Sequence, residues 1–134
     1  MTKIKWLTGG VIFILVLIIV IANLGLDPAY FPFVYKIPGL DKFGHFILIG
    51  LLSYLVNNLY NGKKVKLLSL RILKGSLVVF TIVALEELSQ ILLAYRAFSI
   101  LDLGFDLAGI IIFGRVAEYI LRSKTDYSDP EQAI

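Results

Sequence analysis

The chain has 134 residues, of which 58% are hydrophobic and only 17% are charged, a composition that excludes an ordinary soluble globular protein and indicates a single membrane domain. The absence of cysteine excludes disulfides, thiolate zinc sites and a cysteine nucleophile. The net charge of +3 does not indicate nucleic-acid binding, because the basic residues gather at the ends of apolar runs.

Four apolar stretches, at residues 7–26, 43–60, 73–94 and 103–121, are each close to the ~20 residues that cross about 30 Å of hydrocarbon. Backbone groups in lipid must form hydrogen bonds within their own segment, so the sequence predicts an all-α membrane protein with four transmembrane helices. The first stretch exceeds the roughly 7 to 15 apolar residues of a signal peptide, which favours a retained anchor helix.

The distribution of lysine and arginine predicts the topology, because cytoplasmic loops carry an excess of both. Only Lys36, Lys42 and Arg96 fall on one side, whereas nine basic residues fall on the other: Lys3, Lys5, Lys63, Lys64, Lys66, Arg71, Lys74, Arg122 and Lys124. Both termini and the basic segment 63–74 are therefore predicted to be cytoplasmic. This segment is read as a topology signal, with recognition of anionic lipid as the alternative.

Two connecting or terminal segments have distinct compositions. Residues 27–42 contain Tyr30, Phe31, Phe33 and Tyr35 among three prolines, which suits a position at the headgroup level of the outer leaflet. Residues 126–134 are polar and lack an apolar pattern, so they are predicted to form a disordered tail after a single domain at residues 1–125.

Polar and ionisable residues gather near the outer ends of the second, third and fourth predicted helices. Such residues are expensive in a membrane, so a set that meets in space is a functional hypothesis. The four-residue spacing places Asp41 with His45, and Asp102 with Asp106, on shared helix faces. Gln90 lies one turn beyond two glutamates. The set comprises Asp41, Lys42, His45, Glu86, Glu87, Gln90, Arg96, Ser99, Asp102 and Asp106.

This mixture of acids, one imidazole and cations fits a site that handles phosphate. His45, Glu87 and Asp102 are the candidate catalytic residues, with His45 or Glu87 as general base or acid. The other members of the set are candidate binding residues, and Lys42 and Arg96 would hold a phosphate. A divalent cation bound by His45 and the carboxylates is an alternative, but the sequence lacks a dense ligand motif, so the identity of any metal is unknown.

The motifs Asp41-Lys42-Phe43-Gly44-His45-Phe46, Glu87-x-x-Gln90 and Arg96-x-x-Ser99-x-x-Asp102, followed by Gly109, resemble the VanZ-like family of small bacterial membrane proteins over residues 38–114. The resemblance implies a multi-pass protein of the bacterial cell membrane. The family is named after a member associated with resistance to the glycopeptide antibiotic teicoplanin. Where the family usually has asparagine one turn after the aspartate, this chain has Asp106.

Structural explanations compete with these functional ones. Asp41 is suited to accept hydrogen bonds as the cap of the second helix, and Ser99 with Asp102 fits a capping box. A lone histidine such as His45 is more often structural than catalytic. Arg96 suits a headgroup anchor, a salt bridge to Asp102 or a phosphate ligand. Glu86 and Glu87 are not expected to cap a helix, because they lie in the middle of one.

Three classes of function therefore remain. The first is an enzyme acting on a lipid headgroup or lipid-linked cell-envelope intermediate at the outer leaflet. The second is a non-catalytic binder of lipid or of an amphiphilic antibiotic. In the third, the polar residues only bond to one another and specify helix packing. Membrane lipids are the expected partners in the first two. The sequence identifies neither the ligand nor the oligomeric state.

Overall fold

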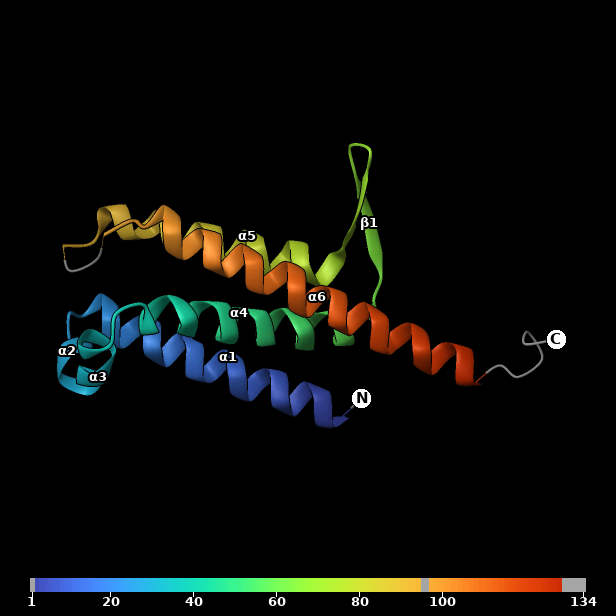
Figure 1. Cartoon of the computed structure of the whole chain (residues 1–134), viewed down its shortest axis with the longest axis horizontal. Helices are drawn as coiled ribbons and strands as arrows, with labels where there is room; N and C mark the ends of the chain where they lie inside the picture. The colour runs from blue at the N-terminus through green and yellow to red at the C-terminus, as the bar shows by residue number, and fades with distance from the viewer. Residues whose placement is uncertain (1, 95–96, 129–134) are drawn as a thin grey trace.

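The computed structural model describes residues 2–94 and 97–128. It is mostly helical (79%), and its long helices lie roughly along one axis of the molecule (Figure 1). These are α1 (Thr2–Asn23), α4 (Leu40–Leu59), α5 (Lys74–Ser89) and α6 (Ile100–Ser128). The shorter elements are α2 (Asp27–Tyr30), α3 (Pro32–Lys36), the hairpin strands β1 (Lys64–Leu67) and β2 (Leu70–Leu73), and the 3-10 helix η1 (Gln90–Leu92).

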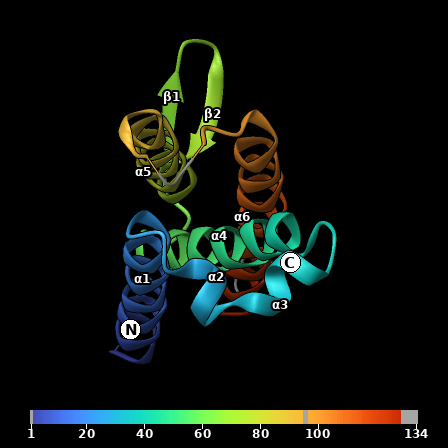
Figure 2. The same cartoon turned by 90° about the vertical axis from the view of Figure 1, so that its left-hand side faces the viewer.

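Helix α4 is central, since it packs against α1, α5 and α6. Consecutive long helices run in opposite directions, so the N-terminus and the end of α6 lie toward the same end of the molecule (Figure 1). We call the end where α4 and α6 begin the site end, and the end where α4 finishes and α5 begins the hairpin end. The short helices α2 and α3 lie at the site end, as the end-on view in Figure 2 shows.

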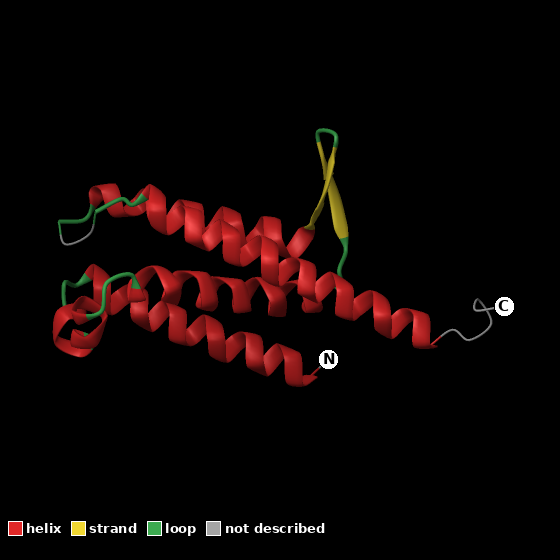
Figure 3. Cartoon of the chain, in the orientation of Figure 1, coloured by secondary structure: helices red, strands yellow, loops and turns green. Residues whose placement is uncertain are grey.

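The structure corrects the prediction of a purely helical chain, because β1 and β2 form an antiparallel hairpin (Figure 3). Residues 64–67 alternate between lysine and apolar side chains, which is the period of a strand with two different faces. Helix α5 ends at Ser89 rather than near residue 94. At this end, Ser89 Oγ donates to the Glu86 carbonyl and the chain continues as the tighter 3-10 helix η1.

Helix α6 also differs from its prediction, since it continues to Ser128. Residues 126–128, which were assigned to a disordered tail, are therefore helical. The extension contains neither glycine nor proline, and the first proline follows at position 130, so nothing in the backbone interrupts it. The rest of the predicted tail, residues 129–134, lies outside the described residues.

The interior of the bundle is unusually polar and its exterior unusually apolar. Among the described residues, the largest fully buried side chains are mostly polar: Leu55, Gln90, Glu87, Val79, Asn57, Asp106 and Ser53. Large apolar side chains face outward on each outer helix, including Phe13 on α1, Ile82 on α5 and Ile111 on α6. Water-soluble monomers rarely expose such extensive apolar surface, whereas hydrocarbon solvates it and drives polar groups inward.

Two helical segments are long and apolar enough to cross a membrane, namely Thr2–Asn23 and Lys74–Leu92. The second consists of α5 together with η1. Helix α6 also exposes large apolar side chains, as α1 and α5 do, whereas in the central helix α4 Phe43 is the exposed one.

Helices α4 and α6 approach closely because glycine occupies their contact. A β-carbon on Gly109 would collide with the carbonyl oxygen of Phe46 and would lie 3.2 Å from the amide nitrogen of Gly50. One on Gly50 would lie 2.5 Å from the ring of Phe113. Glycine at these positions lets the two backbones meet.

A buried hydrogen-bonded network joins α4, α5 and α6 near the hairpin end. Asn57 Nδ2 donates to Ser76 Oγ at 2.8 Å, and its Oδ1 accepts from the Ser76 amide at 3.1 Å. Ser53 Oγ lies 3.2 Å from Ser76 Oγ and donates to the Ile110 carbonyl at 3.3 Å. The amide of Asn57 is thus satisfied at both its oxygen and its nitrogen, which removes most of the cost of burying it.

Candidate functional site

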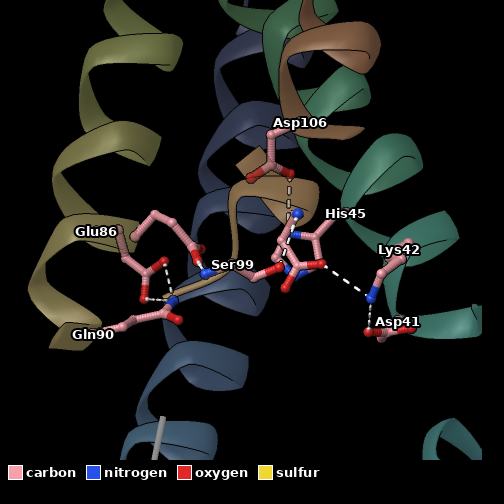
Figure 4. A network of polar contacts seen from close by, with 9 residues as sticks. Asp41, Lys42, His45, Glu86, Gln90, Ser99 and Asp106 are labelled. Atoms are coloured by element: carbon pink, nitrogen blue, oxygen red, sulfur yellow. Dashed lines mark hydrogen bonds and ion pairs between the residues drawn. The ribbon is translucent and has the colours of Figure 1, made fainter. Parts of the chain in front are cut away.

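Two polar contacts connect α4 to α6 at the site end (Figure 4). Lys42 Nζ lies 3.4 Å from Asp102 Oδ1, and His45 Nδ1 lies 3.0 Å from Asp106 Oδ1. Lys42 and His45 are three residues apart on α4, and the two aspartates are four residues apart on α6, so each pair shares one helix face. The Lys42–Asp102 and His45–Asp106 contacts are therefore about one helical turn apart.

The contact between His45 and Asp106 combines a partly accessible imidazole with a buried carboxylate. The His45 side chain is 28% exposed, whereas the Asp106 side chain is 2% exposed. Because a carboxylate only accepts hydrogen bonds, Nδ1 carries the proton directed at Asp106, and in the neutral ring Nε2 then holds the lone pair. Within the described part of the chain, Nε2 makes no hydrogen bond. A buried acid therefore orients an imidazole whose second nitrogen is available for proton transfer.

Lys42 lies between two carboxylates at the rim of the site. Its ammonium donates a hydrogen bond of 2.9 Å to Asp41 Oδ2 and also faces Asp102. The Lys42 side chain is 30% exposed to a ligand approaching from outside the bundle.

Glu87 caps α6 from the neighbouring helix. Its residue is 1% exposed, and its Oε1 accepts the backbone N–H of Ser99 at 2.6 Å. Ser99 Oγ in turn accepts the amide of Asp102 at 3.2 Å. The prediction that a mid-helix glutamate cannot act as a cap is wrong, because α5 ends beside the start of α6. Glu87 occupies the place that Asp102 would take in a capping box, which leaves Asp102 to face Lys42.

Gln90 of η1 and Glu86 of α5 form a separate pair, on the side of the site that α4 and α6 do not form. The amide Nε2 of Gln90 donates to both carboxylate oxygens of Glu86, at 3.1 and 3.0 Å. The sequence predicts Gln90 beside either Glu86 or Glu87, and in the structure Gln90 pairs with Glu86. Gln90 is buried and Glu86 is partly exposed, so the pair connects the edge of the site to its interior.

The structure brings most of the predicted set together but rearranges its partners. Figure 4 shows side chains from α4, η1, α6 and the end of α5 at one level. Asp41 does not pair with His45, because it points to Lys42 instead. Nor does Asp41 cap α4: Gly39 occupies the N-cap position with a φ of 79°, and no side chain bonds there. Arg96, together with its predicted pairing to Asp102, lies outside the described residues.

The predicted alternative of a divalent cation is not supported by the geometry. Across residues 2–94 and 97–128, no three His, Asp or Glu side chains come together in a way that could hold a metal ion. The carboxylates are instead directed toward Lys42, the Ser99 amide, the Gln90 amide and the His45 ring.

Sequence reasoning missed two polar groups. One is the Asn57 network, which the polar residues Ser53 and Asn57 inside an apolar run should have revealed. The other is Glu118, whose carboxylate contacts three cations at the hairpin end: Lys64 at 2.5 Å, Arg122 at 2.5 Å and Arg115 at 3.5 Å. The four-residue spacing of Glu118 and Arg122 predicts their ion pair, whereas the contact of Glu118 with Lys64 depends on the position of the hairpin.

In comparisons with known proteins, no protein-family model, curated protein or solved structure matches this chain.

Proposed function

We propose that this chain is a VanZ-like, multi-pass protein of the bacterial cell membrane in which α1, α4, α5 and α6 all cross the bilayer. The apolar outer surface and polar interior of the bundle support this placement. Helix α4 has 20 residues, a length of about 30 Å, which matches the hydrocarbon thickness. The basic residues of the N-terminus, the hairpin and the end of α6 favour an orientation with the hairpin end in the cytoplasm and the site end outside.

The site then acts on a phosphate-bearing lipid headgroup or lipid-linked cell-envelope intermediate at the outer leaflet. The observation that carries this proposal is the partly exposed imidazole of His45, held by the buried Asp106 within one turn of the cationic Lys42. Helix packing alone does not require a partly exposed imidazole whose Nε2 makes no hydrogen bond within the described residues.

The chemistry follows from the positions of these groups. The ammonium of Lys42 attracts a phosphate oxygen, and its contacts with Asp41 and Asp102 orient it without burying it. Nε2 of His45 takes a proton from an attacking water or hydroxyl, and Asp106 stabilises the imidazolium that forms. Asp102 faces Lys42 and thereby positions it. Glu87 fixes the start of α6 and so the place of both aspartates.

The test is turnover by the purified protein in membranes that contain a panel of phospholipids and a lipid-linked cell-wall precursor. We expect turnover to fall by at least about 100-fold in His45→Ala, because general acid–base catalysis contributes about 10²–10⁴. Asp106→Asn should also lose activity while Glu118→Gln, at the opposite end, retains it. Absence of product with every lipid, or equal activity in His45→Ala, would refute the catalytic proposal.

A non-catalytic lipid or antibiotic binder is the second candidate, and the short helices favour it. Tyr30, Phe33 and Tyr35 are exposed on α2 and α3 at the site end. Exposed aromatic side chains at this level suit contact with headgroups or an amphiphilic ligand. Binding that depends on Lys42 and the aromatic residues, persists in His45→Ala and yields no product would select this function. The connection to glycopeptide resistance rests on the family resemblance.

A further inference from the structure

The hairpin at the other end of the bundle has two chemically different faces. The strand register pairs Lys66 with Arg71 on one face, and it pairs Val65 with Ile72 and Leu67 with Leu70 on the opposite face. Side chains alternate between faces along a strand, so Lys64 joins the cationic face. An open hollow of about 270 Å³ is lined by Lys64, Val65, Lys66 and Arg71.

The tip of the hairpin carries exposed leucines on both sides of Ser69. Leu68 is 90% exposed, and Leu67 and Leu70 beside it are also exposed. Leu68 has a φ of 56°, a left-handed conformation that glycine or asparagine adopts more readily. A leucine in a strained, exposed turn has a cost in water without a packing gain within the described chain.

The base of the hairpin is firmly attached to the helices. Lys64 forms an ion pair with Glu118 of α6, and the Lys74 amide donates to the Lys63 carbonyl at 2.8 Å. Leu73 is buried, and the Lys74 ammonium lies 4.9 Å from the centre of the Tyr60 ring. The strands therefore leave the bundle in a defined direction. Figures 1 and 2 both show the hairpin projecting sideways from the helices, away from the bundle.

We propose that this hairpin is a membrane-surface anchor, which lies on the cytoplasmic leaflet and binds anionic phospholipid. The inference rests on the proposed crossing of the bilayer by the bundle. The hairpin begins where α4 ends and α5 starts, which is the level at which both helices leave the hydrocarbon. A sideways projection from that level runs along the membrane plane.

The positive charge of the hairpin favours anionic phospholipid as its ligand. Segment 63–74 contains five basic residues and no acidic residue. Within the described residues, Lys66 and Arg71 make no ion pair, so both are available to lipid phosphates. Leu67, Leu68 and Leu70 enter the boundary between headgroups and acyl chains, and the basic side chains extend their charged ends to the phosphate level.

The test uses single cysteines, because the chain contains none of its own. The full-length protein carries an environment-sensitive fluorophore at Leu68→Cys, in vesicles of phosphatidylcholine with or without phosphatidylglycerol. We expect a blue-shifted emission that is quenched by lipid-attached quenchers when phosphatidylglycerol is present. Replacing both Lys66 and Arg71 by glutamine should lower the ratio of inserted to free hairpin about 30-fold, since each cation near an anionic surface contributes about fivefold.

Two further labels separate the proposal from its premise. A label at Ile14→Cys, in the exposed middle of α1, reports whether the bundle lies in hydrocarbon, and one at Lys124→Cys on α6 reports an aqueous position. If Ile14→Cys is in hydrocarbon and Leu68→Cys remains in water, the anchor proposal fails and the membrane placement stands. If both are in water, the placement itself fails. Equal insertion of Leu68→Cys with and without anionic lipid overturns the assignment to anionic phospholipid.

Discussion

Replacing Gly109 by alanine should separate α4 from α6 and break the site. The new β-carbon would collide with the Phe46 carbonyl oxygen, which belongs to helix backbone and cannot rotate away. Relief requires α4 and α6 to move apart by about 1 Å, toward ordinary van der Waals separation. The contact between His45 and Asp106, now 3.0 Å, would then exceed the length of a hydrogen bond.

The expected loss of stability is about 1–3 kcal/mol, as for other overpacked interiors, reduced by up to about 1 kcal/mol because alanine favours the helix more than glycine does. Gly104→Ala is the matched control, because it lies on the same helix and a β-carbon there meets nothing within 4 Å. It should be neutral or stabilising. Unfolding of both variants is measured in the same detergent. If the two prove equally stable, the close contact at Gly109 is not as described.

Three further outcomes follow from the described contacts. Glu87→Ala should destabilise the protein by about 1–2 kcal/mol, because it leaves the Ser99 amide without its acceptor. Glu87→Gln keeps an oxygen at that position and should cost less. Thermal unfolding of the two variants measures the difference, and equal losses of stability would argue against the cap. Asn57→Leu should cost about 1–3 kcal/mol in the same assay, because it leaves the Ser76 backbone amide without its buried acceptor. Asn58→Ala should cost little, because the Asn58 side chain is partly exposed and donates to the Tyr54 carbonyl of its own helix. The reverse order would contradict the buried network. Glu118→Gln should accelerate hydrogen exchange in residues 64–73, because it weakens the attachment of Lys64 to α6. Exchange in α4 near His45 should not change. Unchanged exchange in the hairpin would show that Leu73 and the backbone hydrogen bond are sufficient to attach the hairpin to the helices.

Much of the helical framework could be predicted because long apolar runs interrupted by polar segments favour long helices. The apolar runs at residues 7–26 and 43–60 correspond to α1 and α4, and the level of the polar residues follows from counting along each helix. The hairpin was missed because lysines at every second position between helices resemble a basic loop. Its strand period covers only a few residues, too few to outweigh the charge pattern.

The partners within the site were harder to predict than its members. Spacing along α4 puts both Asp41 and Lys42 within one turn of His45, and only the packing against α6 decides that Lys42 and His45 face inward. The role of Glu87 depends on how the chain returns from α5 to α6. That return is a tertiary relationship with no local sequence pattern, so the cap could not be recognised from residues 99–102 alone.

The most direct measurement of the central claim is the nitrogen-15 NMR spectrum of the imidazole in the membrane-embedded protein, which needs no assignment because His45 is the only histidine. Well above the ordinary histidine pKa of about 6.5, the ring should be protonated at Nδ1 and carry a lone pair at Nε2. In Asp106→Asn this preference should be lost. A ring protonated at Nε2, with a spectrum unchanged by Asp106→Asn, would contradict an imidazole held by Asp106 for proton transfer.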